Sequence, residues 1–177
     1  QDTKRAYLTF DDGPSVNTEK ILDFLKANNI KATFFVIGAE GYDDLYKRIV
    51  DEGHTLAIHS NTHAYDEIYT SVDAFMKDIG VLSTKLEKLT GVKPNILRFP
   101  GGSNNTISNR YNSTGIMDKI IDKVTKEGYH YYDWNVDSLD ASAKLQDKDV
   151  IVKSVLDGAK DMKNAIILMH RRDRKSV

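Results

Sequence analysis

The sequence contains no cysteine, so the chain can form no disulfide bond and offer no thiolate to a metal ion. No apolar stretch approaches the roughly 20 residues of a membrane-spanning helix, and we expect no membrane insertion within this chain. Acidic and basic residues nearly cancel, at 26 and 25, which argues against nucleic acid or an anionic membrane as a partner. A hydrophobic fraction of 40% and a length of 177 residues suit one globular domain.

Short apolar runs alternate along the chain with longer runs in which apolar residues recur every three to four positions. The first pattern is typical of buried strands and the second of amphipathic helices. Strands are predicted at residues 6–10, 32–37, 55–58, 95–98, 129–135 and 165–169. Helices are predicted at residues 18–28, 43–52, 72–89, 117–126 and 149–162. This alternation predicts an α/β fold in which a parallel sheet, either a barrel or an open sheet, has its helices outside.

Polar residues stand at or just after the ends of five of these predicted strands. The groups, in chain order, are Asp11 and Asp12, His59 and His63, Arg98 to Gly102, Asp137 and Asp140, and His170. In parallel α/β barrels, active sites lie at the carboxyl ends of the strands. Five groups placed in this way are therefore expected to converge on one mouth of the barrel.

Two adjacent carboxylates, Asp11 and Asp12, and two imidazoles four positions apart, His59 and His63, suggest a metal site. One carboxylate and two imidazoles can ligate a divalent ion, and the second carboxylate can then act as a base in metal-assisted hydrolysis. Residues i and i+4 of a strand lie about 13 Å apart, so we expect a helical turn to bring the imidazoles together. We expect one zinc ion, with cobalt, nickel or iron as alternatives. Taken alone, the Asp-Asp-Gly-Pro run would also suit a solvated turn.

These motifs resemble the polysaccharide deacetylases of carbohydrate esterase family 4, the NodB-homology domain. The run TFDDGP at 9–14 is similar to the first family motif, and HSNTH at 59–63 matches the H-S/T-x-x-H motif. RFP at 98–100 matches R-x-P, DSLD at 137–140 resembles D-x-x-D, and LMH at 168–170 resembles L-x-H. The resemblance implies a distorted (β/α) barrel with fewer than eight complete units, as one catalytic domain over the whole chain. Family members usually continue past the last motif with a helix and a strand, so a truncated C-terminus is one expectation.

The resemblance also implies roles for the residues of these motifs. Asp12, His59 and His63 would hold the metal. Asp11 would be the general base that takes a proton from the attacking water. His170 would be the general acid that protonates the leaving amine, and a histidine near its ordinary pKa suits that task.

Further roles implied by the resemblance concern positioning and substrate contacts. Arg98 would orient the base, and Asp140 would in turn hold Arg98. The backbone N–H of Gly101 would help to stabilise the oxyanion. Trp134 and Leu168 would line the pocket for the acetyl methyl group.

Simpler interpretations of some of these residues stay open at this point. Arg98 could form a surface ion pair, and Trp134 could be plain core packing. Asp137 and Asp140 could cap the next helix, because aspartate is a good N-cap residue. Two histidines outside any motif are predicted to be structural, His54 and His130.

The expected activity is metal-dependent removal of N-acetyl groups from N-acetylglucosamine units of a polysaccharide. The GGSNN loop and the DWNVDS run look most like those of peptidoglycan deacetylases from Gram-positive bacteria. Alternatives are a chitin-oligomer or acetylxylan deacetylase, a sugar-binding module that has lost turnover, and a metal hydrolase of another amide or ester such as a cyclic imide. We expect a monomer at the cell surface or outside the cell, in the bacterial cell wall, with any signal or anchor segment absent from this chain.

Overall fold

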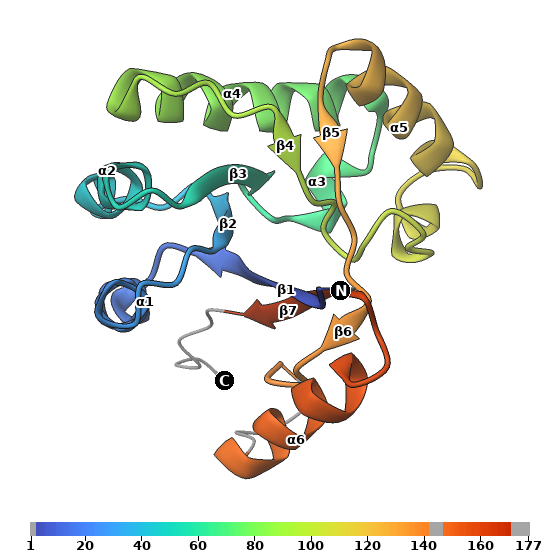
Figure 1. Cartoon of the computed structure of the whole chain (residues 1–177). Helices are drawn as coiled ribbons and strands as arrows, with labels where there is room; N and C mark the ends of the chain where they lie inside the picture. The colour runs from blue at the N-terminus through green and yellow to red at the C-terminus, as the bar shows by residue number, and fades with distance from the viewer. Residues whose placement is uncertain (1–2, 142–146, 171–177) are drawn as a thin grey trace.

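The chain folds around one curved sheet in the computed structural model, which describes residues 3–141 and 147–170. Its strands are β1 (Arg5–Gly13), β2 (Thr33–Ile37), β3 (Thr55–Ser60), β4 (Ile96–Leu97), β5 (His130–Tyr131), β6 (Val136–Asp137) and β7 (Asn164–His170). The seven strands lie in the order β5-β4-β3-β2-β1-β7-β6, and all neighbours run parallel. The sheet curls into a half-barrel (Figure 1), which confirms the predicted distorted barrel of fewer than eight units.

Helices cover the outside of the curve (Figure 1). They are α1 (Val16–Ala27), α2 (Asp43–Asp51), α3 (Tyr65–Ile68), α4 (Val72–Thr90), α5 (Ile116–Lys126) and α6 (Lys148–Ala159), with a 3-10 turn, η1 (Ile107–Arg110). On α4, the apolar residues Phe75, Ile79 and Leu82 recur every three or four positions, and all are buried. Burial of such a stripe stabilises the fold by roughly 25 cal/mol per Å² of apolar surface. Among the described residues, no helix has the length and apolar character needed to cross a membrane.

The prediction of one strand at 129–135 is wrong, and the difference shapes the site. The chain leaves β5 at one edge of the sheet and enters β6 at the other edge, so residues 132–135 cross the opening of the half-barrel (Figure 1). The N–H of Tyr132 donates to the carbonyl of Leu97 beside β5, whereas the N–H of Asn135 donates to Ile166 in β7. An aromatic-rich run favours extended backbone throughout. It does not reveal that the run changes its pairing partner halfway.

Candidate active site

The polar groups at the strand ends meet in one cavity of about 300 Å³. Eight of the residues predicted for the site line it: Asp11, Asp12, His59, His63, Gly101, Trp134, Leu168 and His170. Four further residues complete the lining, and two of them, Phe99 and Asp137, also belong to the groups at the strand ends; the other two are Tyr65 and Ala141. The predicted convergence on one mouth of the barrel is therefore confirmed. Arg98 and Asp140 do not line the cavity, but Arg98 is hydrogen-bonded to Asp11 and Asp140 to His170, which both do.

A bulge in β1 turns two adjacent carboxylates toward the same cavity. Asp11 pairs with Phe35 of β2, but the next paired residue is Gly13, so Asp12 is the extra residue. Its φ of 65° lies in the left-handed region, which aspartate adopts more readily than most residues. In a regular strand, successive side chains point to opposite faces. The bulge removes that alternation and allows both carboxylates to line the site.

The two imidazoles come together in a different way from the predicted helical turn. His59 belongs to β3, and His63 lies in the turn that follows, before α3 begins. The φ of His63 is 54°, again left-handed, and the two imidazole ring centroids are 5.1 Å apart. The prediction of a helical turn is wrong, because a tight turn at the end of a strand shortens the distance between residues i and i+4 equally well.

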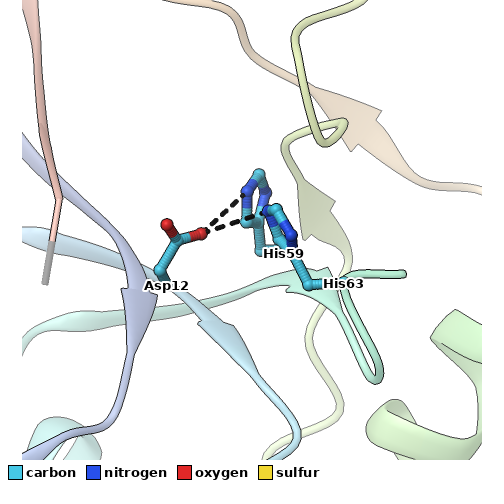
Figure 2. A group of neighbouring side chains, drawn as sticks. All are labelled: Asp12, His59 and His63. Atoms are coloured by element: carbon cyan, nitrogen blue, oxygen red, sulfur yellow. Dashed lines mark ion pairs between the residues drawn. The ribbon is translucent and has the colours of Figure 1, made fainter. Parts of the chain in front are cut away.

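Asp12, His59 and His63 form a group that fits a divalent metal ion (Figure 2). Nε2 of His59 and Nε2 of His63 lie 3.4 and 3.3 Å from Oδ1 of Asp12. Two ligand atoms about 2.1 Å from one ion at tetrahedral angles are about 3.4 Å apart. Nδ1 of His59 lies 2.6 Å from the carbonyl oxygen of Arg98, which can only accept a hydrogen bond. In the neutral ring, Nε2 therefore carries the lone pair and faces a carboxylate oxygen, an arrangement that calls for a cation.

The charges of this group favour an ionised carboxylate. Burial by itself would raise the pKa of Asp12, but the hydrogen bond and charge of His59, with the charges of His63 and His170, lower it to about 2. Burial would likewise lower the pKa of His59, but Asp11 and Asp12 outweigh it and raise that pKa. Asp12 is therefore an anion at any ordinary working pH, as a metal ligand must be.

Arg98 is fully buried and joins Asp11 to residues 132–135, the segment that crosses the opening. Its Nη1 donates to Oδ1 of Asp11 at 2.9 Å and to Oγ1 of Thr9 at 2.8 Å. Its Nε and Nη2 donate to the carbonyl oxygens of Tyr132 and Asp133, both at 3.1 Å. The surface ion pair considered for Arg98 is excluded by this burial. The guanidinium fixes the carboxylate of Asp11 while also fastening residues 132–135 across the opening.

Asp140 bonds to His170, which corrects the prediction that it would hold Arg98. Its Oδ2 accepts from the backbone N–H of His170 at 2.6 Å, and its Oδ1 lies 3.0 Å from Nδ1 of the same residue. The physical reason is strand order: β6 pairs with β7, so the turn after β6 passes over the end of β7. Burial would lower the pKa of His170, but the hydrogen bond and charge of Asp140, helped by Asp12 and Asp11, raise it.

The helix-capping alternative for the D-x-x-D motif is also wrong. Helix α6 is capped by Asp147, whose side chain accepts from the N–H of Asp149. Asp137 instead accepts from the N–H of Leu139, two residues on, and so stabilises the turn that delivers Asp140.

Two glycines shape the loop after β4, together with one carboxylate, Asp133, that no motif predicted. Gly101 and Gly102 have φ values of 83° and 90°, in the left-handed region that favours glycine. A Cβ on Gly102 would lie 3.3 Å from the ring of Trp134, so this loop and Trp134 pack closely. Asp133 fastens the loop by accepting from both the N–H and the hydroxyl of Ser103. Trp134 therefore packs against the loop and lines the cavity at the same time.

Comparison with known proteins agrees with this fold. A family model described as polysaccharide deacetylase matches residues 1–118. The chain belongs to the polysaccharide deacetylase family, which confirms the predicted resemblance. Among solved structures, it is similar to the catalytic domain of a peptidoglycan N-acetylglucosamine deacetylase from Eubacterium rectale, with a TM-score of 0.90 and 42% identity. That match covers 93% of this chain and 75% of the other.

Two curated relatives extend the comparison. A peptidoglycan-N-acetylglucosamine deacetylase from Bacillus cereus is 34% identical over 186 residues, covering 100% of this chain and 63% of the relative. A bifunctional xylanase/deacetylase from Pseudobutyrivibrio xylanivorans is 35% identical over 174 residues, covering 96% of this chain and 25% of the relative. The chain thus spans less than two thirds of the length of these curated relatives.

Proposed function

We propose that this protein is a metal-dependent deacetylase that hydrolyses N-acetyl groups of N-acetylglucosamine units in a polysaccharide, with peptidoglycan as the favoured polymer. One observation carries the proposal: Asp12, His59 and His63 share a cavity with the Arg98-bound carboxylate of Asp11. Family membership supports a deacetylase, and the relatives from Eubacterium rectale and Bacillus cereus, both described as peptidoglycan N-acetylglucosamine deacetylases, support the polymer.

Asp11 would act as the base. Its Oδ1 is occupied by Arg98, while its Oδ2 lies 3.9 Å from Nε2 of His59, beside the ligand group. Oδ2 is therefore the oxygen that takes a proton from the attacking water. Bound by Asp12, His59 and His63, a divalent ion would supply Lewis acidity toward the amide carbonyl and the water.

His170 would serve as the acid, because an amine leaves poorly unless it is protonated. Asp140 fixes the orientation of this imidazole, because its carboxylate is hydrogen-bonded to both the backbone N–H and Nδ1 of His170. Nε2 is then the nitrogen available to the leaving group. The N–H of Gly101 would donate to the oxyanion that develops as the carbonyl is attacked. Trp134 and Leu168 would form the wall against the acetyl methyl group, since both line the cavity.

The acid role predicts how activity depends on pH. An acid works only while protonated, so activity should fall as pH rises through the pKa of His170. Asp140 raises that pKa, so Asp140→Asn should lower it and move the alkaline limb of the profile to lower pH. The measurement is the initial rate of acetate release against pH. Asp118→Asn, at an exposed position on α5, is the control, and an unmoved limb in Asp140→Asn would contradict the acid role.

Acetate release with added and withdrawn metal tests the proposed function. Purified protein should release acetate from peptidoglycan or from N-acetylglucosamine oligomers, stop after chelation, and recover with added zinc or cobalt. His63→Ala should remove both metal binding and release, because it deletes one of three ligands. His130→Ala, at an exposed position in β5 that does not line the cavity, should keep both.

The choice of polymers separates the remaining alternatives. Acetylxylan belongs in the panel because one relative is a bifunctional xylanase/deacetylase. A preference for chitin oligomers or acetylxylan would keep the deacetylase and change its substrate. Stoichiometric metal with sugar binding but no release from any polymer would identify a binding module and refute the enzyme. Location at the cell surface or outside the cell stays a prediction that follows from a cell-wall substrate.

A further inference from the structure

The turn that joins His59 to His63, residues 60–62, is hydrogen-bonded to helix α4 by one buried carboxylate, Asp78. Oδ2 of Asp78 accepts from the hydroxyl of Ser60 at 2.7 Å and from the N–H of Asn61 at 2.8 Å. Oδ1 accepts from the N–H and the hydroxyl of Thr62, at 3.0 and 3.2 Å. Three consecutive residues of the turn are therefore bound by a side chain that lies outside every family motif and does not line the cavity.

The hydrogen bonds extend from this carboxylate to the ligand itself. The hydroxyl of Ser60 donates to Asp78 and accepts from the N–H of His63 at 3.0 Å. His63 needs such support, because its left-handed φ of 54° is an unfavourable conformation for a residue other than glycine. Asp78 thus acts on the backbone of His63 through one intervening hydroxyl.

The opposite side of the turn packs closely against Gly38. The N–H of Gly38, just after β2, donates to the carbonyl of Asn61 at 3.0 Å. A Cβ on Gly38 would lie 2.7 Å from that carbonyl oxygen and closer still to the side chain of Asn61. The turn is therefore held between the end of β2 and Asp78 on α4.

The donor count explains why this position needs a carboxylate. Four donors point at two oxygens, and both oxygens must accept. An amide of the same shape has one oxygen, and its NH₂ group would face two donors. Bonds to a buried charged group contribute more than neutral ones, and leaving buried donors unpaired is costly.

We infer that Asp78 is a positioning residue that sets the affinity of the metal site by holding the turn that carries His63. The inference rests on the proposed metal-dependent function. Asp78 touches neither substrate nor ion, and it acts through Ser60 and the backbone of residues 61 and 62. Loss of such outer partners typically lowers metal affinity about 10–100-fold.

The experiment is a titration of the metal-free protein with Co²⁺, followed through the visible absorption of the bound ion, with Zn²⁺ in competition. Asp78→Asn should fold, as judged by circular dichroism, but bind Co²⁺ about 10–100-fold more weakly and with a shifted absorption band. The band reports the geometry of the ligands, so a fold-wide loss of stability would not shift it. Ser83→Ala is the matched control, since Ser83 is also buried on α4 and its hydroxyl has no hydrogen-bond partner among the described residues.

The outcomes separate this inference from the proposed function. A wild type that binds neither Co²⁺ nor Zn²⁺ would overturn the proposed function and this inference with it. If the wild type binds Co²⁺ and a folded Asp78→Asn binds it with the same affinity and absorption band, the inference is overturned and the proposed function stands. If Asp78→Asn does not fold, Thr62→Val decides at an exposed residue, because it removes the bond from the Thr62 hydroxyl to Asp78, together with the bond that this hydroxyl accepts from the N–H of Ala64. Thr62→Ser keeps a hydroxyl for both bonds and is the control. A several-fold weaker Co²⁺ affinity in Thr62→Val but not in Thr62→Ser supports the role of Asp78, and an unchanged affinity in Thr62→Val overturns it.

Discussion

Replacing Asp11 with asparagine should reduce acetate release by about 10²–10⁴-fold, the range usual for loss of a positioned general base. Asparagine keeps the shape of the side chain and can still accept from Arg98, but it cannot take a proton from water. Metal binding should persist, because Asp12, His59 and His63 form the ligand group without Asp11. The variant therefore separates the two adjacent carboxylates, one as base and one as ligand.

Two measurements on the same Asp11→Asn preparation test this division of roles. Acetate release should be lost, while the Co²⁺ affinity and absorption band should stay close to those of the wild type. Asp118→Asn, which makes the same chemical change at an exposed position, should alter neither. Full activity in Asp11→Asn would show that another group is the base. Loss of Co²⁺ binding would show that Asp11 also ligates the ion.

Short motifs allowed much of the site to be predicted from the sequence. One carboxylate and two imidazoles were predicted as a metal site because these are ordinary metal ligands, and the family resemblance singled out Asp12 as the carboxylate; the structure places Asp12, His59 and His63 together. Their location followed from the alternating pattern, which brings the ends of parallel strands to one mouth. Side-chain chemistry and strand direction were enough to predict a metal site at this mouth, whereas the division of roles between Asp11 and Asp12 came from the resemblance.

Two predictions that depended on tertiary contacts were wrong. Asp140 was expected to hold Arg98, yet it bonds to His170, because β6 pairs with β7 and not with a strand near Arg98. The run at 129–135 was expected to be one strand, yet it changes partners across the opening. Neither outcome is encoded in a local pattern, since both depend on which strands become neighbours.

One missed residue did leave a signal in the sequence. Asp78 lies between Phe75 and Ile79, within the apolar stripe that predicted a buried face of helix α4. A carboxylate at a core position is rarely buried without partners. That mismatch indicates a buried hydrogen-bonding role, although only the structure shows that the partners belong to the turn between the histidines.

Arg98→Met should lower the free energy of unfolding by about 3–5 kcal/mol, the cost expected when one partner of a buried ion pair is removed. Both members of the pair are almost completely buried, with Arg98 0% and Asp11 2% exposed. Methionine would leave the Asp11 carboxylate without its partner and would release the carbonyls of Tyr132 and Asp133. Activity should fall as well, because Asp11, the proposed base, loses the group that fixes it. Urea unfolding of the metal-free protein measures the change.

The double variant gives the sharper test. Asp11→Asn alone leaves the positive charge of Arg98 buried without its anion, and Arg98→Met alone leaves the negative charge of Asp11 buried without its cation. The double variant has no unpaired charge, so its loss of stability should be smaller than the sum of the two single losses. Additive losses would mean that the carbonyl bonds to the crossing segment, rather than the ion pair, dominate the contribution of Arg98.

Arg98→Lys distinguishes these contributions further, because an ammonium keeps the charge but cannot reproduce the planar set of donors that reaches Asp11 and both carbonyls. If the ion pair dominates, the free energy of unfolding of Arg98→Lys should be closer to that of the wild type than to that of Arg98→Met.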